Sequence, residues 1–285
     1  MPLPAPRTAA GREGLAALLA DPGRALVGFD FDGTLAPIVD DPAQARAHHG
    51  VRPVLERLAP SLGRVAVVTG RPARAAVEYS GLAGLPGLTV LGHYGLERWT
   101  DGEVETPPPH AGVESARSRL AEVLAEAAAP DGTAVEDKGH AVAVHVRRAV
   151  DPAAAMTAVE GPLRRLADET GLVVEPGRMV LELRPPGMDK GAALRGLLEQ
   201  ARPSVVVFAG DDLGDLAAFA AVEDARRTGV PGLLLCSGST EVTALAQRAD
   251  LVVDGPEGVV GFLEDLAEAL GAGEDPVSPG REPAR

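Results

Sequence analysis

Short, almost continuous apolar runs alternate with helix-like stretches along most of the chain. Six runs are typical of buried strands: residues 25–31, 64–70, 88–92, 204–210, 232–236 and 250–254. Helical patterns lie between and after these runs, for example at 52–59 and 257–270. Strands that are apolar at consecutive positions, separated by helices, predict an α/β fold whose parallel sheet is covered on both faces.

The middle of the chain has a different pattern. After three prolines at 107–109, it predicts a helix near 113–129, a hairpin from 133–138 and 140–147, a helix at 152–170 and two more strands, the last at 179–184. This order predicts a small α+β domain with an antiparallel sheet. We therefore expect a discontinuous core of residues 1–108 and 186–270, an inserted domain of residues 109–185, and a disordered Pro/Gly-rich tail from 271 to 285.

The strands of the inserted domain alternate between apolar and polar positions, which assigns their side chains to two faces. The predicted apolar face carries Val142, Val144, Val146, Met179, Leu181 and Leu183. The predicted polar face carries Glu136, Lys138, His145, Arg147, Glu182 and Arg184. Two interpretations of the polar face remain open at this point: it is a solvated sheet surface, or it closes over a polyhydroxylated ligand.

The composition limits the classes of partner that we expect the protein to bind. Acidic residues outnumber basic ones 41 to 27, giving a formal charge of −14, which disfavours nucleic acid and anionic membranes. A single cysteine, Cys236, excludes an intramolecular disulfide, and the sequence contains neither a signal-peptide pattern nor about 18 consecutive apolar residues. We expect a cytoplasmic protein with a small-molecule substrate; its protein partners are not predicted.

The strongest chemical signal is Asp30-Phe31-Asp32-Gly33-Thr34-Leu35, which ends the first apolar run. Open α/β sheets bind ligands at the carboxyl ends of their strands, where this motif places two carboxylates. Buried carboxylates are costly without a counter-charge, so a cation is their natural partner.

This motif resembles that of the haloacid dehalogenase superfamily of phosphotransferases. Thr69, Lys190 and the Gly210-Asp211-Asp212-Leu213-Gly214-Asp215 string occur in the order that the superfamily shows. The resemblance implies a Rossmann-like core with an inserted α+β cap domain.

The resemblance also implies a mechanism. Asp30 is the expected nucleophile and Asp32 the expected acid and base. Thr69 and Lys190 are expected to bind the transferring phosphoryl group. Mg²⁺ is the expected cofactor, held by Asp30, Asp32 and Asp211. Asp215 and Asp212 are expected to support the metal site, with Asp215 orienting Lys190; whether Asp212 binds the metal stays open.

Within the superfamily, the chain resembles most the trehalose-6-phosphate phosphatases. The strings that carry the resemblance include DFDGTLAPIV, VVTGR, HYGLE, VEDKGHAVAVHVR, LELRPPGMDKG and GDDLGD. The resemblance implies that the substrate is bound by Gly70, Arg71, Glu136, Lys138, Arg147 and Glu182, the last four through the sugar hydroxyls. His93, Glu97 and His145 are weaker candidates, for which bracing of the cap hinge is the alternative. It favours a binding role for the polar face of the inserted domain.

Two departures from the family pattern stand out. The acidic motif, GDDxTDE in the family, has Gly214 and Leu216 in place of its Thr and Glu, and DYDGT is DFDGT here. The main alternative function is the same chemistry on another sugar phosphate, such as a pseudo-disaccharide phosphate, sucrose phosphate or a glucosylglycerate-type phosphate. A phosphomutase is a weaker alternative, and a sugar-phosphate sensor without turnover is an alternative from a different class.

Overall fold

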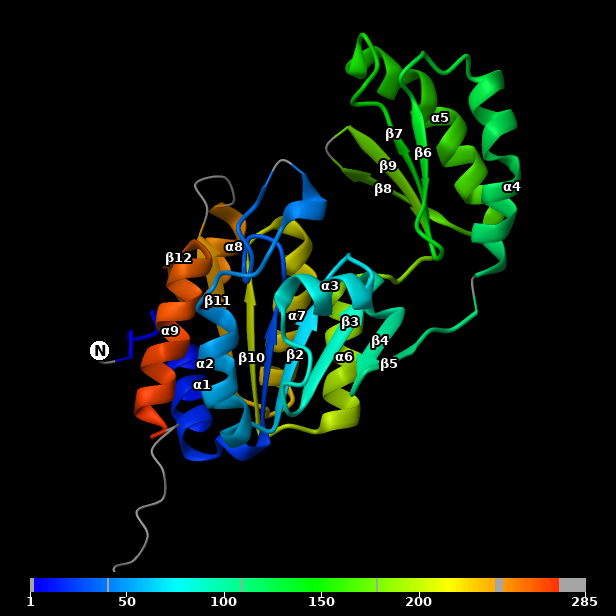
Figure 1. Ribbon diagram of the computed structural model, residues 1–285. Coiled ribbons are helices and arrows are strands. Elements are labelled where there is room, and N and C mark those ends of the chain that lie inside the picture. Colours follow the sequence, from blue (N-terminus) through cyan, green and yellow to red (C-terminus); the bar gives the residue numbers. More distant parts are fainter. Residues whose placement is uncertain (1–2, 40, 109, 178, 239–242, 272–285) are drawn as a thin grey trace, which may run out of the picture. The chain divides into compact units, whose positions relative to one another are not determined.

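The computed structural model describes residues 3–39, 41–108, 110–177, 179–238 and 243–271 (Figure 1). The chain forms two compact units. The larger unit combines the chain up to Glu105 with the chain from Asp189 onward, and the smaller unit is Thr106–Met188. Of the predicted tail, 271–285, residues 272–285 lie outside the described residues. None of the helices in the described ranges is both long and apolar enough to cross a membrane.

The larger unit is built on one sheet with the order β12-β11-β10-β1-β2-β3-β4-β5. Its strands are β1 (Ala25–Phe29), β2 (Arg64–Val68), β3 (Leu88–Gly92), β4 (Glu97–Thr100), β5 (Glu103–Glu105), β10 (Val205–Gly210), β11 (Gly232–Gly238) and β12 (Leu251–Asp254). The six strands from β12 to β3 are parallel, whereas β4 and β5 pair antiparallel at the edge. The predicted α/β fold is confirmed.

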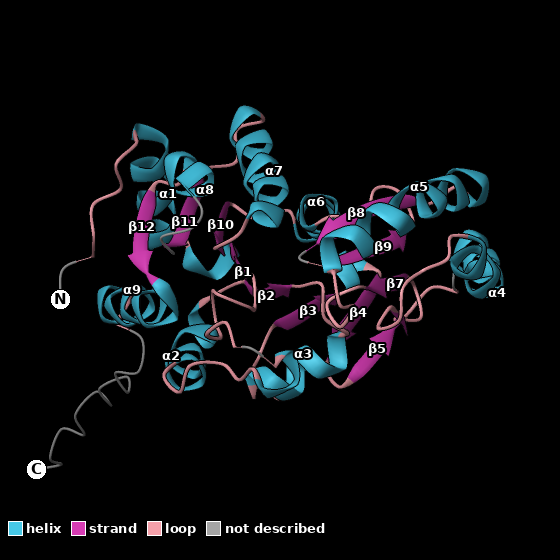
Figure 2. Ribbon diagram, turned by 90° about the horizontal axis from the view of Figure 1, so that it is seen from above, coloured by secondary structure: helices cyan, strands magenta, loops and turns pink. Residues whose placement is uncertain are grey.

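Helices cover both faces of this sheet. The helices of the larger unit are α1 (Ala9–Ala20), α2 (Val51–Leu58), α3 (Ala73–Ser80), α6 (Lys190–Ala201), α7 (Leu216–Arg227), α8 (Thr243–Arg248) and α9 (Gly255–Ala269). Figure 2 shows α2, α3 and α9 along one side of the strands and α6 and α7 along the other. The sheet is thus the middle of three layers, which explains why its strands are apolar at consecutive positions.

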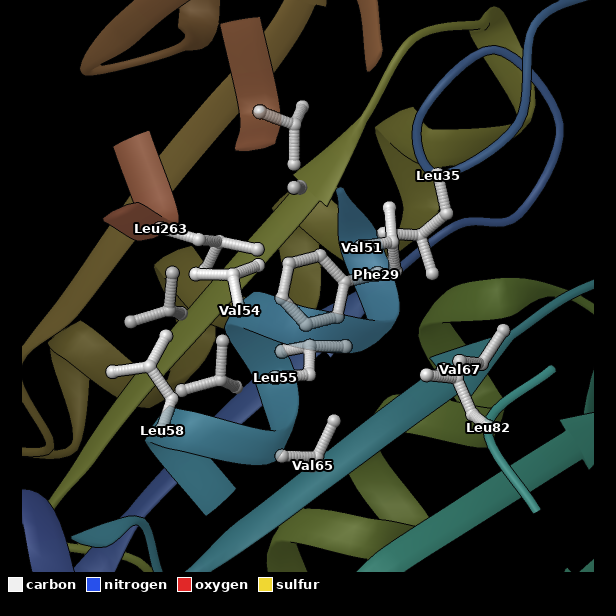
Figure 3. Packing of buried hydrophobic residues seen from close by; sticks show 14 of the residues in the cluster. Phe29, Leu35, Val51, Val54, Leu55, Leu58, Val65, Val67, Leu82 and Leu263 are labelled. Atoms are coloured by element: carbon white, nitrogen blue, oxygen red, sulfur yellow. The ribbon is translucent and has the colours of Figure 1, made fainter. Parts of the chain in front are cut away.

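Successive residues of β1 serve the two faces. Val27 and Phe29 join the core under α2, α3 and α9, while Leu26 joins the core under α6, α7 and α8. Figure 3 shows Phe29 beside Val54 and Leu55 of α2. Each face therefore takes every second side chain of the strand, as the pleat requires.

The buried Asp250 carboxylate joins α1, α7 and β11. It accepts hydrogen bonds from the Thr8 hydroxyl, the Arg226 guanidinium and the Leu234 N–H, the last at 2.7 Å. The Asp250 side chain is wholly buried and that of Arg226 is 18 % exposed. Because the pair is largely buried, each charge depends mainly on the other for compensation.

The smaller unit contains one antiparallel sheet with two helices on one face. Strands β6 (Ala134–Asp137), β7 (Val142–His145), β9 (Val180–Arg184) and β8 (Val173–Gly177) follow one another in that order across the sheet. Helices α4 (Ala111–Glu126) and α5 (Pro152–Thr170) pack on its apolar face. Val142, Val144, Val146, Leu181 and Leu183 are buried there, as alternation predicts.

Two predicted details differ in the structure. Met179 was assigned to the apolar face, which is wrong: it precedes β9, has a left-handed φ of 59° and is 41 % exposed. Its carbonyl instead accepts a hydrogen bond from Val146. The first strand ends at Phe29 and not at residue 31, because the chain turns there, with the Phe31 carbonyl accepting from the N–H groups of Leu35 and Ala36.

Replacing Asp250 by alanine leaves the Arg226 guanidinium in a buried environment without its counter-charge. We expect this variant to lose about 3–5 kcal/mol of unfolding free energy, measured by urea denaturation. The matched control is Asp224→Ala, which removes an exposed carboxylate from Arg227 and Arg195 and costs less than about 1 kcal/mol. A loss of the same small size in both variants would contradict a central role for Asp250.

Candidate active site

The polar side chains of interest follow the carboxyl ends of neighbouring strands. From β1 the chain continues to β2 on one side, whereas from β10 it continues to β11 on the other side. The strand order therefore reverses between β1 and β10, although the two strands are parallel. In open α/β sheets, ligands usually bind at the carboxyl ends of the strands, next to such a reversal of the strand order. Asp30 directly follows β1, Thr69 follows β2 and Asp211 follows β10.

Lys190, the first residue of α6, is the centre of the site. Its Nζ lies 2.8 Å from Asp30 Oδ2, 2.8 Å from Asp215 Oδ1 and 3.8 Å from Asp212 Oδ1. The side chains of Lys190 and Asp30 are each 6 % exposed, and that of Asp215 is wholly buried. The structure thus brings the predicted lysine into direct contact with the predicted nucleophile.

Burial and neighbouring charges shift the pKa values of the Asp30, Asp211 and Lys190 side chains. Burial raises the pKa of Asp30, and it also raises the pKa of Asp211, to about 7, with help from the charges of Asp215 and Asp212. For Lys190, burial alone would lower the pKa, but the carboxylates of Asp30 and Asp215 outweigh it and raise the pKa well above its usual value. The site therefore favours a charged lysine and resists further negative charge.

Asp215 organises the acidic loop that follows β10. Its second oxygen, Oδ2, accepts hydrogen bonds from the backbone N–H groups of Asp211 at 3.0 Å and Asp212 at 3.2 Å. The same carboxylate binds Lys190, so one buried side chain fixes both the loop and the ammonium. These contacts form with Gly214 and Leu216 in place of the Thr and Glu of the family's acidic motif.

Asp211 lies against the loop that carries Asp30 and Asp32. Thr34 Oγ1 donates to Asp211 Oδ1 at 3.2 Å, and a side chain at Gly33 would place its Cβ 2.0 Å from the other oxygen. Gly33 also has a φ of 77°, a conformation that suits glycine. Only glycine therefore allows the two acidic loops to approach each other this closely.

Ser237 is a supporting residue that the sequence analysis missed. It lies at the carboxyl end of β11, is buried, and donates to the Gly33 carbonyl at 2.7 Å. The apolar run was predicted to end at Cys236, one residue short of this serine. Its place at the carboxyl end of a strand beside β10 is the signal that identifies it.

Thr69, Gly70 and Arg71 form the next part of the site. The Thr69 hydroxyl accepts from the Arg71 N–H at 3.2 Å, and Arg71 makes two hydrogen bonds to Asp32, each 2.7 Å. These hydrogen bonds raise the pKa of the Arg71 guanidinium. A Cβ on residue 70 would lie 2.7 Å from the Tyr94 hydroxyl, so a side chain there would require the Tyr94 ring to shift.

The HYGLE loop, His93 to Glu97, forms hydrogen bonds to the turn that follows β2. The N–H groups of His93 and Tyr94 donate to the carbonyls of Arg71 and Thr69, at 2.9 and 3.0 Å. Glu97 Oε2 accepts from the Ala73 N–H at 2.6 Å, at the start of α3, and Glu97 Oε1 lies 3.8 Å from His93 Nε2. His93 and Glu97 are thus found bracing the turn that carries Thr69.

The polar face of the smaller unit holds the other predicted residues. The cross-strand row Glu136, Ala143, Glu182 and Glu175 runs across all four strands. Glu182 binds Lys138, His145 Nε2 lies 2.7 Å from Glu136, and Arg147 Nη2 lies 3.2 Å from His145 Nδ1. Glu136, Lys138, His145, Arg147 and Glu182 therefore form one charged surface over this sheet.

A further pair on this face was not predicted as part of a site. Arg184 donates to Glu175 at 2.8 Å, and its side chain is only 10 % exposed. Alternation placed Arg184 correctly on the polar face. Glu175 was missed because its strand is short and is followed by Pro176-Gly177. These two residues obscure the alternation of the strand.

The acidic cluster of the larger unit can hold a metal ion. Carboxylate oxygens of Asp30, Asp212 and Asp215 lie within 4.8 Å of one another, and the Lys190 ammonium lies among them. This group shares only Asp30 with the predicted ligands Asp30, Asp32 and Asp211, because the Asp32 carboxylate is bound by Arg71. One ammonium does not balance the buried carboxylates of Asp30, Asp211 and Asp215. Excess carboxylate oxygen is the environment that hard divalent cations prefer.

Fold and site together agree with the resemblance to the haloacid dehalogenase superfamily. The sheet is parallel, an aspartate follows its first strand, a threonine follows the second, and a lysine binds both that aspartate and an acidic loop. The structure is similar to that of a haloacid dehalogenase-like hydrolase from Bacteroides thetaiotaomicron, with a TM-score of 0.59 at 17 % identity over 85 % of this chain and 99 % of that one.

The chain belongs to the trehalose-phosphatase family, whose model matches residues 28–253. It is 35 % identical over 257 residues to the trehalose-phosphate phosphatase of Mycobacterium avium, covering 86 % of this chain and 63 % of that protein. The chain thus spans less than two thirds of that relative's length. The C-terminal domain of a Candida albicans trehalose-6-phosphate phosphatase superposes with a TM-score of 0.69, at 21 % identity over 93 % of this chain and 99 % of that one.

The raised pKa of Asp211 predicts a pH-dependent stability without metal. The folded pKa, about 7, exceeds the usual value of about 3.9, so the stability contributed by this group is complete below pH 4 and is lost as the pH rises through 7. At pH 8 in EDTA we expect Asp211→Asn to be more stable than the wild type by about 1–3 kcal/mol, with a much smaller difference at pH 4.

Thermal unfolding at the two pH values measures this difference. Asp168→Asn, at an exposed position of α5, is the control and shows no pH-dependent gain. A variant less stable than the wild type at pH 8 in EDTA would contradict the excess of negative charge.

Proposed function

We propose that this protein hydrolyses trehalose 6-phosphate to trehalose and phosphate, the last step of trehalose biosynthesis. The observation that carries the proposal is the contact between Lys190 and Asp30 at the carboxyl edge of the sheet. Family membership and the trehalose-phosphate phosphatase relatives support the substrate. The charged face of the smaller unit supports a polyhydroxylated ligand, because sugar hydroxyls donate to carboxylates and accept from lysine and arginine.

The reaction has two steps. In the first, an Asp30 oxygen attacks phosphorus, the bond to the sugar oxygen breaks, and Asp32 gives a proton to that oxygen. In the second, Asp32 takes a proton from water, whose oxygen attacks phosphorus and breaks the bond to Asp30. One water molecule is consumed and the enzyme is regenerated, so one difficult displacement becomes two easier ones.

The remaining core residues would stabilise the negative charge of the phosphate and bind the metal ion. Lys190 reduces the repulsion between the Asp30 carboxylate and the phosphate, while Thr69 donates a hydrogen bond to the phosphoryl oxygens. Asp30, the Asp32 carbonyl and Asp211 would hold Mg²⁺, with Asp212 and Asp215 behind them. When bound, the metal ion would act as a Lewis acid and neutralise phosphate charge.

The polar face of the smaller unit would recognise the sugar. Glu136, Lys138, Arg147 and Glu182 are proposed to contact its hydroxyl groups, and His145 to orient Glu136. Gly70 would contact the substrate through its backbone, because the space of a side chain there is taken by the Tyr94 hydroxyl. The same chemistry on another disaccharide-like phosphate is the alternative, and the substrate panel below decides between them.

Phosphate release from a panel of sugar phosphates tests the activity. We expect trehalose 6-phosphate to be the preferred ester, with turnover lost in EDTA and restored by Mg²⁺. Asp30→Asn should lower kcat by at least about a thousandfold. Preference for another ester would keep the chemistry and overturn the substrate, whereas no release from any ester would favour a binding protein without turnover.

The sugar contacts have a separate test. Glu182→Gln weakens a charged hydrogen bond, so we expect KM for trehalose 6-phosphate to rise about 10-fold or more. KM for p-nitrophenyl phosphate, which has no sugar, should stay unchanged. The control is Glu169→Gln, which alters an exposed partner of Arg119 in the helical layer of the same unit. Equal effects of Glu182→Gln on both esters would argue against sugar recognition by this face.

A further inference from the structure

The Arg71 guanidinium is already engaged by the protein. Its Nε donates to Asp32 Oδ2 and its Nη2 to Asp32 Oδ1, each at 2.7 Å, while its Nη1 donates to the Pro42 carbonyl at 2.7 Å. The Arg71 side chain is only 15 % exposed, compared with 41 % for the carboxylate that it binds. Each of its three nitrogen atoms therefore has a protein partner.

Two aromatic rings fix the guanidinium further. Its central carbon lies 5.3 Å from the Phe31 ring centroid and 5.4 Å from that of Tyr79. Phe31 is fully buried in the core, and Tyr79 belongs to α3. Contacts of a guanidinium with aromatic faces are attractive at these distances, so Arg71 has a defined orientation as well as a full set of hydrogen bonds.

We propose that Arg71 is a positioning residue for Asp32 and acts on the reaction through that carboxylate, not by binding the substrate. The planar fork of an arginine holds both oxygens of a carboxylate and so fixes its plane. The contact with Pro42 links the same arginine to the loop that follows the nucleophile. This inference rests on the proposed function and departs from the substrate-binding role that the family resemblance implies for Arg71.

The two reaction steps make different demands on Asp32. When a sugar alkoxide leaves, it needs the proton of Asp32 as its bond to phosphorus breaks, so a misplaced Asp32 slows the first step. p-Nitrophenolate leaves as a stable anion and needs no proton, so its release tolerates a misplaced Asp32. Hydrolysis of the aspartyl phosphate needs Asp32 to take a proton from water, whichever ester was used.

The experiment compares wild type, Arg71→Gln, Arg71→Lys, Asp32→Asn and the double variant Asp32→Asn/Arg71→Gln, all with Mg²⁺. With trehalose 6-phosphate, Arg71→Gln should lower kcat about 10- to 100-fold, a part of the usual general acid–base contribution, with KM changed less than about threefold. With p-nitrophenyl phosphate, the same variant should release about one equivalent of nitrophenolate rapidly and then turn over slowly.

The double variant provides the sharpest criterion. If Arg71 acts through Asp32, its replacement adds less than about twofold to the loss in Asp32→Asn, because the residue that it positions is already disabled. Arg71→Lys should also lose kcat, since an ammonium cannot hold both oxygens. Arg71→Lys keeps the charge and serves as the test variant if Arg71→Gln does not fold, as judged by thermal unfolding.

Arg46→Gln is the matched control. Arg46 lies 4.4 Å from the centroid of the same Tyr79 ring and donates to the carbonyls of Ala43 and Ala45. It has no hydrogen bond to Asp32 among the described contacts, so its replacement should leave kcat within about twofold of the wild type.

Three results would overturn the inference. A higher KM with unchanged kcat in Arg71→Gln would show that Arg71 binds substrate. Multiplicative losses in the double variant would show that Arg71 acts independently of Asp32. A wild-type protein that hydrolyses neither ester would refute the proposed function and this inference with it, whereas the first two results would leave the proposed function intact.

Discussion

The structure depends on one electrostatic arrangement: a single buried ammonium among several buried carboxylates at the carboxyl edge of a parallel sheet. Lys190 contacts Asp30 and Asp215 at equal distances, so it joins the nucleophile to the acidic loop. Separate elements must meet for this contact to form, because Asp30 follows β1, Asp215 follows β10 and Lys190 opens α6. Burial, helped by the charges of Asp215 and Asp212, raises the pKa of Asp211, and the excess of carboxylates makes the cluster suitable for a cation.

The sheet topology explains how residues so far apart in the chain meet. β1 lies between β10 and β2 in parallel register, so the ends of three strands from two distant segments reach the same edge. Close approach then depends on small details, such as the absence of a side chain at Gly33 beside Asp211 and the Ser237 hydroxyl on the Gly33 carbonyl. The parallel sheet brings the site residues to the same edge, and these contacts determine how closely their side chains approach one another.

The sequence predicted the parts that depend on regular periods. Continuous apolar runs identified the six parallel strands, and their carboxyl ends placed Asp30, Thr69 and Asp211 together. The β4–β5 hairpin was not predicted, because its strands are short and rich in charged residues, without an apolar run.

The contacts of long side chains and the local turns could not be predicted from the hydrophobic periodicity of the sequence. The partner of Arg71 depends on the direction of a long side chain, which spacing does not determine. Met179 was misassigned because a left-handed residue interrupts the strand period that alternation assumes. Ser237 and Glu175 were missed because each lies next to a point where its strand pattern ends.

The interrupted order of the larger unit has a consequence for synthesis on the ribosome. β1 and β2 emerge early, but β10, which pairs with β1, follows only after the whole smaller unit. Helices α6, α7 and α8, which cover Leu26 and Val68 on one face, are also made late. A nascent chain therefore carries an unpaired central strand edge and an uncovered apolar face through much of translation, the kind of surface that chaperones bind and that promotes aggregation.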